Sequence, residues 1–214
     1  VEHTMSLGDA DYKFTGQTNY QHAGETVSSA GDIDGDGLDD IMISARHAGP
    51  GCCSYRGQVY IVLGASLSDT WPIQLSESDH TLVGGNTYDY LGHALASAGD
   101  IDGDGLDDIL IGAHGNDTTG SNAGITYLML GSDFGASRDI PLSSVSYHIT
   151  GAYGSDESGY SLGGGGDIDG DGLSDVLIGA RYNPDGGVSA GAVYVLFGNG
   201  FGDDRDLDLY LDAD

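Results

Sequence analysis

Short runs of apolar residues recur along the chain, and glycine stands at the end of most of them. Residues 107–113 read DDILIGA and residues 125–131 read ITYLMLG. Runs of this length, rich in Ile, Leu, Val and Tyr, predict strands whose two sheet faces are both covered. No segment shows a sustained 3.6-residue period, so the pattern predicts an all-β protein.

The apolar runs belong to a repeat that covers nearly the whole chain. An acidic stretch occurs three times, as GDIDGDGLDDIMISA (31–45), GDIDGDGLDDILIGA (99–113) and GDIDGDGLSDVLIGA (166–180). Downstream, Tyr60, Tyr127 and Tyr194 are spaced by 67 residues. A period of this size indicates a solenoid, a propeller or an array. We therefore predict one repetitive domain over residues 1–214, with repeats at approximately 9–78, 79–146 and 147–214.

Each repeat is predicted to contain four short strands. In the second repeat these are HTLVG (80–84), HALASAG (93–99), DDILIGA (107–113) and ITYLMLG (125–131). Four strands per unit, repeated radially, describe the blades of a β-propeller. The predicted fold is thus three four-stranded propeller blades.

The acidic stretch has the spacing of a calcium-binding loop. Within DIDGDGLDD, carboxylates stand at positions 1, 3, 5 and 9, and glycines at positions 4 and 6 allow a tight backbone turn. Carboxylates that converge repel one another unless a cation lies between them, and Ca²⁺ takes oxygen ligands in flexible geometry. We predict three calcium ions, one per repeat, with side-chain ligands Asp32, Asp34, Asp36 and Asp40, then Asp100, Asp102, Asp104 and Asp108, then Asp167, Asp169, Asp171 and Asp175.

The other loop positions carry further expectations. Leu38, Leu106 and Leu173 at position 7 are predicted to offer their backbone carbonyls to the ion while their side chains join the core. The position-8 residues, Asp39, Asp107 and Ser174, are predicted to point outward.

Two other structures could carry the same residues. An EF-hand requires a bidentate Glu at position 12, where this chain has Ile43, Ile111 and Ile178, so an EF-hand is excluded. The second alternative is an Asp-Gly turn that binds nothing. Three copies with all twelve acids in register argue against that interpretation.

The charge limits the partners. The net charge is −28, with 34 acidic residues against six Lys and Arg. Such a chain is unsuited to nucleic acid or to anionic membrane surfaces, and its self-repulsion favours bound cations. No apolar run approaches 18 residues, so no membrane insertion is expected.

The repeats resemble FG-GAP repeats, the blades of the integrin α-subunit propeller, and the DxDGDGxxD loop is the specific part of the match. The "FG" position is degenerate, as Ala23-Gly24, Leu91-Gly92 and Ser158-Gly159. The "GAP" position reads Ser44-Ala45-Arg46, Gly112-Ala113-His114 and Gly179-Ala180-Arg181. The resemblance implies a seven-bladed, calcium-stiffened propeller, extracellular or at the cell surface, that binds other macromolecules. Integrin ligand specificity is not carried over, because it lies in loops that this chain does not share.

Three blades are fewer than the four to eight of a propeller. In this family the first strand of each repeat belongs to the preceding blade, so 80–84 and 147–151 would complete the first two blades. The third blade would then lack its outer strand, and Tyr12 to Gly16 would be unpaired. Two interpretations stay open: a homodimer that closes a six-bladed ring, or a segment of a longer propeller.

No enzyme is predicted. Gly159 to Gly163 fits G-x-S-x-G, but a nucleophile elbow needs a strand, a sharp turn and a helix, and here the motif precedes an acidic loop. His80 and His148 lie in predicted strands, which favours structural roles over metal binding. Asn116-Asp117-Thr118 is a glycosylation sequon. The adjacent Cys52 and Cys53 would be two thiols or one strained bridge.

The loops after the third strand of each repeat diverge most, and loops on a rigid scaffold often carry recognition. They comprise Arg46 to Arg56, His114 to Asn122 and Arg181 to Ser189. Arg and Tyr are enriched at binding hot spots. The predicted contacts to a protein or glycan ligand are therefore Arg46, Tyr55, Arg56, Arg181 and Tyr182. The alternative is a structural propeller appended to the catalytic domain of a larger secreted enzyme.

Overall fold

The computed structural model describes residues 6–49, 54–67, 72–201 and 206–208. Cys52 and Cys53 lie outside the described residues. The described chain contains strands and single turns of 3-10 helix, which confirms the all-β prediction. None of the helices in these ranges is long and apolar enough to cross a membrane.

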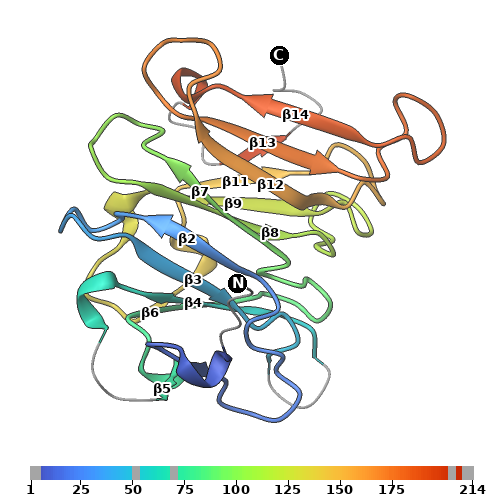
Figure 1. The fold of residues 1–214 in the computed structure, drawn as a ribbon. Coiled ribbons are helices and arrows are strands. Elements are labelled where there is room, and N and C mark those ends of the chain that lie inside the picture. The colour runs from blue at the N-terminus through green and yellow to red at the C-terminus, as the bar shows by residue number, and fades with distance from the viewer. Residues whose placement is uncertain (1–5, 50–53, 68–71, 202–205, 209–214) are drawn as a thin grey trace, which may run out of the picture.

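The described strands form four sheets, and the three larger ones are blades that lie one above another in chain order (Figure 1). The first blade contains β2 (Val27–Gly31), β3 (Asp40–Ser44), β4 (Gln58–Val62), β6 (His80–Val83) and β10 (Asp139–Ile140). The second contains β7 (Ala94–Gly99), β8 (Asp108–Ala113), β9 (Ile125–Met129), β11 (Tyr147–Thr150) and β15 (Asp206–Asp208). The third contains β12 (Ser158–Gly166), β13 (Asp175–Ala180) and β14 (Ala192–Leu196). In the described residues these blades form an open stack and not a closed ring.

The outer strand of each of the first two blades comes from the following repeat, as predicted. The strand β6 pairs antiparallel with β4, and β11 pairs antiparallel with β9. A fifth, very short strand then pairs in parallel with each of these outer strands, β10 with β6 and β15 with β11. The first two blades are therefore five-stranded, one strand more than the sequence pattern indicated.

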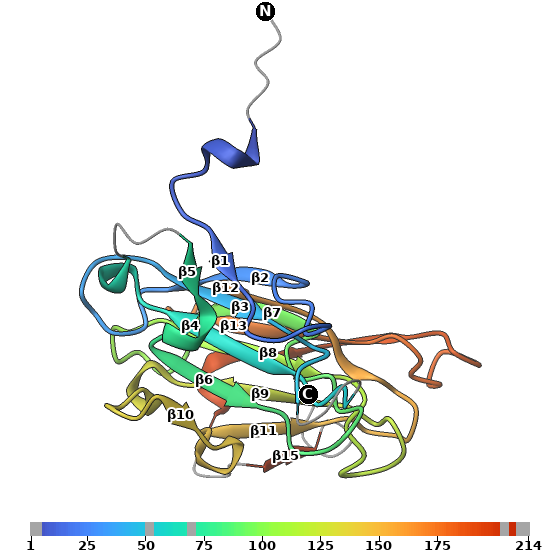
Figure 2. The ribbon, with the colours of Figure 1, turned by 90° about the horizontal axis from the view of Figure 1, so that it is seen from below.

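The N-terminal segment also differs from its prediction. Its strand β1 (Phe14–Thr15) pairs in parallel with β5 (Ile73–Gln74), so the expectation that Tyr12 to Gly16 is unpaired is wrong (Figure 2). This pair corresponds to β6 with β10 and to β11 with β15. The segment thus already has the arrangement of a blade's outer edge. The remaining elements are 3-10 turns: η1 (Leu7–Asp9), η2 (Gly64–Ser66), η3 (Leu75–Glu77), η4 (Gly131–Asp133), η5 (Leu142–Ser144) and η6 (Gly198–Gly200).

Apolar side chains between neighbouring blades form the core. Every residue of β8 and β9, in the middle blade, is buried. Leu110 and Leu128 pack with Val176 and Ile178 of the third blade. On the other side, Ile109 and Ile111 pack with Met42 and Val59 of the first blade. Burial on both faces explains why these strands are almost continuously apolar.

The two outermost sheet faces are less covered. Leu177 of β13 is 37% exposed, whereas its equivalent in the middle blade, Leu110, is fully buried. Val193 of β14 is 70% exposed, whereas its equivalent Thr126 is fully buried. At the opposite end of the stack, Val27 of β2 is 63% exposed. Each end of the stack therefore presents the apolar face that a neighbouring blade covers elsewhere.

Loop residues also join the blades. The backbone N–H of Asp107 donates to the carbonyl of Asp32 in the preceding blade, at 3.0 Å. The N–H of Asp32 in turn donates to the Asp107 carboxylate, at 2.9 Å. Likewise the N–H of Ser174 donates to the Asp100 carbonyl, at 3.0 Å. The prediction that position 8 points outward is therefore wrong for Asp107 and Ser174, because both side chains lie against the preceding blade.

We predict that Asp107→Ala destabilises the fold by about 1.5–3 kcal/mol, the usual contribution of a hydrogen bond to a charged group. Urea unfolding followed by circular dichroism measures this loss. The matched control is Asp39→Ala, at the same loop position of the first blade, where the side chain is exposed. Its expected effect stays within about 0.5 kcal/mol. Equal losses in the two variants would contradict the inter-blade role of Asp107.

Candidate functional site

Each acidic loop connects the first two strands of a blade and curls around its position-1 carboxylate. In the first blade, Asp32 accepts hydrogen bonds from the N–H groups of Gly35 at 2.8 Å and Gly37 at 2.9 Å. Both glycines have left-handed backbones, with φ of 76° and 88°. Asp100 and Asp167 make the same pair of bonds in their loops. The loop backbone is therefore held in one shape in all three repeats.

This shape brings the carboxylates together. In each loop, three acids offer oxygens that lie within 4.8 Å of one another. The groups are Asp32, Asp34 and Asp36; Asp100, Asp102 and Asp108; and Asp167, Asp169 and Asp175. A donor set made only of carboxylate oxygens fits a hard divalent cation such as Ca²⁺.

The position-9 aspartate is buried and ties the loop to the rest of the blade. One carboxylate oxygen of Asp108 accepts from the N–H of Ile101 at 2.8 Å, and the other accepts from Gly131 at 2.8 Å. Asp40 and Asp175 make the equivalent bonds. Burial raises the pKa of Asp108 to about 7, and burial also raises the pKa of Asp40. A cation beside these carboxylates would offset that cost of ionisation.

The prediction that the side chains of the position-7 leucines join the core is wrong. Leu38 is 51% exposed, and Leu106 and Leu173 are half-buried. Leu106 instead lies against the preceding acidic loop, where a Cβ at Gly35 would come within 2.9 Å of its Cδ2 atom. Leu173 lies against Gly103 of the middle loop in the same way. These side chains therefore pack one acidic loop against the next.

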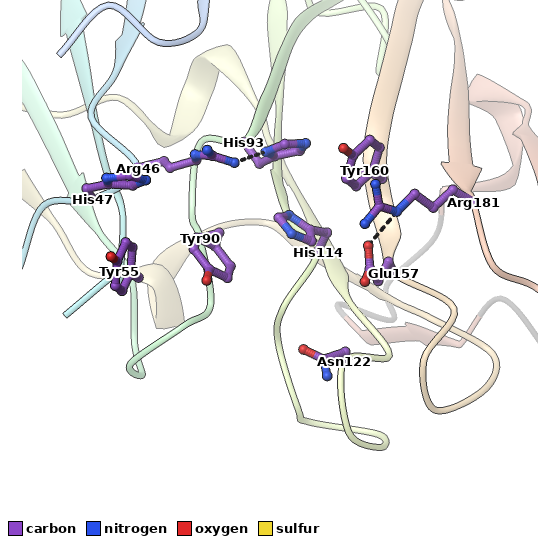
Figure 3. A pocket seen from close by; sticks show the side chains of 10 residues that line it. All are labelled: Arg46, His47, Tyr55, Tyr90, His93, His114, Asn122, Glu157, Tyr160 and Arg181. Atoms are coloured by element: carbon purple, nitrogen blue, oxygen red, sulfur yellow. Dashed lines mark hydrogen bonds and ion pairs between the residues drawn. The ribbon is translucent and has the colours of Figure 1, made fainter. Parts of the chain in front are cut away.

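The opposite end of the blades holds a cavity of about 500 Å³ that draws on all three blades (Figure 3). The strands that flank each acidic loop are antiparallel, so the start of the first strand and the end of the second meet at this end. The lining residues are Arg46, His47, Tyr55, Tyr90, His93, His114, Asn122, Glu157, Tyr160 and Arg181.

Two arginines in the wall are held by ion pairs. Arg46 contacts Glu25 at 2.5 Å and the Nδ1 atom of His93 at 3.1 Å. Arg181 contacts Glu157 at 2.7 Å, and its guanidinium lies 3.8 Å from the centre of the Tyr160 ring. Each guanidinium group is thus fixed in position beside a carboxylate.

Aromatic rings line the cavity between these ion pairs. Tyr90 stacks on His114 with ring centres 5.1 Å apart, and His114 meets Tyr160 edge-on at 5.2 Å. Burial lowers the pKa of His114 to about 3, and burial also lowers the pKa of His93. Both imidazoles are therefore neutral near pH 7. The Nδ1 atom of His114 and the Nε atom of Arg46 are buried without a hydrogen-bond partner among the described residues.

Three of the five predicted ligand contacts, Arg46, Tyr55 and Arg181, lie in the cavity wall. Arg56 and Tyr182 do not, although Tyr182 lies 4.5 Å from the Arg181 guanidinium. Sequence reasoning missed the wall residues Tyr90, His93, Glu157 and Tyr160, which precede or begin the first strands β7 and β12. These positions differ between the aligned repeats, and that divergence is the sequence signal that could have identified them.

Other sequence motifs have structural explanations. Ser161 lies within β12, and an acidic loop follows that strand where a nucleophile elbow would need a helix. Asn116 of the sequon is 4% exposed, and its side chain bonds Asp89. His80 and His148 contact the carbonyls of Ser137 and Leu142, which fits structural roles.

Comparison with known proteins identifies the repeats. The FG-GAP repeat family matches residues 23–62, 91–129 and 158–196, together more than half of the chain. Integrin alpha-5 of Xenopus laevis is 32% identical over 178 residues, covering 79% of this chain and 16% of that protein. Integrin alpha-PS2 of Drosophila melanogaster is 30% identical over 181 residues, covering 81% of this chain and 12% of that protein.

Human integrin alpha-IIb is 35% identical over 111 residues, covering 51% of this chain and 10% of that protein. The chain thus spans less than a fifth of the length of these relatives. The matched segments begin just before β2 and β7 and at the first residue of β12, and they end in β4, β9 and β14, so they follow the blades. The chain belongs to the FG-GAP repeat family, and the three larger of its sheets are β-propeller blades of that family.

Proposed function

We propose that the chain is a calcium-binding propeller module of an extracellular or cell-surface adhesion protein, which binds a protein or glycan ligand in the cavity. The observation that carries this proposal is the contrast between the two ends of the blades. One end repeats the same all-carboxylate loop three times, while the other end presents different side chains from each blade to one cavity. Repetition fits a structural cation, and divergence fits recognition. The integrin alpha relatives support the adhesion role and the extracellular location.

Calcium in this proposal is structural and does not contact the ligand. The carboxylates at positions 1, 3 and 5 and the buried position-9 aspartate would hold one ion per blade, together with the carbonyls of Leu38, Leu106 and Leu173. Each ion would lie where one acidic loop packs on the next. It would offset part of the net charge of −28. Binding only to the folded state then stabilises the fold.

We predict that chelation lowers the melting temperature. With dissociation constants of about 0.1–1 mM, typical of extracellular modules, about 10 mM calcium would stabilise the fold by roughly 1.4–2.7 kcal/mol per site. Calorimetric titration should give three sites in the native chain and two in Asp34→Asn. Asp39→Asn, in the same loop at a position outside the carboxylate cluster, is the matched control and should keep three. A flat titration of the chelated protein would refute the calcium proposal.

The cavity suits a ligand with polar groups and at least one flat face. Rigid aromatic rings supply contact area, and Arg46 and Arg181 supply donors that are already fixed in place. The buried Nδ1 atom of His114 and Nε atom of Arg46 could gain partners from a bound ligand. Sugars and peptide segments both present this combination of groups.

We predict a saturable hit in a screen of glycans and matrix proteins, and loss of that hit in chelator. Arg181→Ala should weaken it by about 2 kcal/mol, roughly 30-fold, because the variant removes a guanidinium that Glu157 and Tyr160 hold in the cavity wall. Arg138→Ala is the matched control, since Arg138 bonds the Ser76 carbonyl and does not line the cavity. Calcium-loaded protein without any saturable hit would favour a purely structural propeller appended to a catalytic domain.

The exposed sheet faces call for further blades, and we propose that a second copy supplies them. A propeller blade needs a covered face on each side, and Leu177, Val193 and Val27 lie on faces that the stack leaves open. Two copies would give a six-bladed ring with two-fold symmetry, in which β1 of each copy adjoins β14 of the other. This contact would also give the third blade the outer strand that it lacks among the described residues.

We predict a mass near twice 22.0 kDa by light scattering in calcium, falling in chelator. Val193→Asp should return the mass to that of a single chain, because it places a charge on the buried face of the contact. Val188→Asp is the matched control, since Val188 is 99% exposed in a loop. A single-chain mass at high concentration would mean that other segments of a longer propeller cover these faces.

A further inference from the structure

A cluster of a different chemical kind lies in the first blade, away from the acidic loops. His22, Glu25 and His47 each offer one ligand atom, and these atoms lie within 4.8 Å of one another. The Oε2 atom of Glu25 is 4.0 Å from the Nε2 atom of His47. Two imidazole nitrogens and one carboxylate oxygen form a donor set that zinc uses with a fourth position left open. Calcium and magnesium, in contrast, prefer oxygen alone.

The fold brings these residues to the same end of the blade. Glu25 lies shortly before β2 and His47 shortly after β3, and these strands run antiparallel. His22 has a left-handed backbone, with φ of 56°. Its ring centre lies 4.3 Å from that of His47, with the ring planes 35° apart. Two of the three ligands are therefore already in contact.

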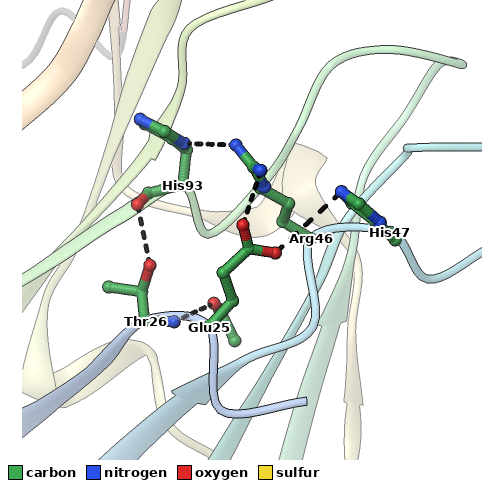
Figure 4. A network of polar contacts seen from close by, with 6 residues as sticks. Glu25, Thr26, Arg46, His47 and His93 are labelled. Atoms are coloured by element: carbon green, nitrogen blue, oxygen red, sulfur yellow. Dashed lines mark hydrogen bonds and ion pairs between the residues drawn. The ribbon is translucent and has the colours of Figure 1, made fainter. Parts of the chain in front are cut away.

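The neighbours of the cluster hold its ligands in place. Arg46 binds the Oε1 atom of Glu25 at 2.5 Å and reaches His93 with its other terminal nitrogen (Figure 4). This leaves the Oε2 atom of Glu25 directed toward His47. Tyr55 packs edge-on against the His47 ring, with centres 4.7 Å apart. Partners of this kind orient the ligands in metal sites and raise their affinity.

The repeat architecture does not account for the cluster. The positions equivalent to His22, Glu25 and His47 hold Tyr90, His93 and Gly115 in the second blade, and Glu157, Tyr160 and Tyr182 in the third. The backbone at the first of these positions is left-handed in all three blades, so the fold is kept without histidine there. The three ligand types coincide in one blade only.

We propose that His22, Glu25 and His47 form a zinc site on the first blade, at the rim of the cavity and independent of the calcium loops. The three side chains are the ligands, and Arg46 is a positioning residue that acts through Glu25. His22 and Glu25 are exposed, and His47 is half-buried, so an ion can reach them from solvent. The open fourth position would hold water or a group of a ligand bound in the cavity.

The test is a calorimetric titration of the full chain with ZnCl₂ in excess calcium, which keeps zinc out of the carboxylate loops. We expect one equivalent of zinc to bind. His22→Asn and His47→Gln should each weaken it at least about tenfold, because even residues behind metal ligands cost 10- to 100-fold when replaced. Asn tolerates the left-handed backbone at position 22. His148→Ala, on β11, is the matched control and should bind zinc like the native chain.

A second readout separates a built site from loose surface binding. Co²⁺ in place of zinc should give the intense visible absorption of a four-coordinate ion, absent in His47→Gln, while circular dichroism stays unchanged. Arg46→Lys, which loosens the hold on Glu25, should weaken zinc binding less than removal of a ligand. The proposal is overturned if no zinc binds in excess calcium or if the two histidine variants bind zinc like the native chain. It is also overturned if calcium is the only thing that abolishes zinc binding, because zinc would then occupy the carboxylate loops.

Discussion

A buried carboxylate at the start of the second strand holds each blade together. In the middle blade, Asp108 accepts one N–H from the acidic loop and one from the η4 turn that follows β9, so a single side chain joins two separate segments. The same arrangement recurs through Asp40 and Asp175. Because burial raises the pKa of Asp108 to about 7, the charge that makes these bonds strong is also costly to keep. The neighbouring carboxylates Asp102 and Asp104 increase that cost, and the proposed cation would offset it.

The two ends of the blades differ in how closely the three repeats resemble one another. At the loop end, the same bonds recur three times, and successive loops contact each other through Asp107, Leu106 and Leu173. At the cavity end, the backbone is equally regular, with left-handed residues at Tyr55, Asn122 and Ser189 at the same repeat position. The side chains it carries are different in each blade. A conserved backbone with changed side chains is how a repeat protein keeps its fold while its binding surface varies.

Much of this could be predicted from the sequence, because the repeat multiplies a local signal. The strands at 94–99, 108–113 and 125–129 follow from their apolar runs, and the transfer of β6 to the preceding blade follows from the family resemblance. The added strands β10 and β15 could not be predicted, since two or three residues carry too little pattern. The contact of Asp107 with Asp32 and the meeting of Arg46, Tyr90 and Arg181 in one cavity also could not. Both depend on how blades pack on one another, and no local periodicity records that.

The offset between repeat and blade has a mechanical consequence. After β4 of the first blade the chain forms β5, which pairs with β1, then returns to the first blade as β6, and only then enters the second blade at β7. A force that pulls the second blade away from the first along the chain must therefore first strip β6 from β4. That step breaks the ladder of backbone hydrogen bonds between β6 and β4. Because β6 comes from the second repeat and pairs with β4 of the first blade, the offset lets the two neighbouring blades bear tension together.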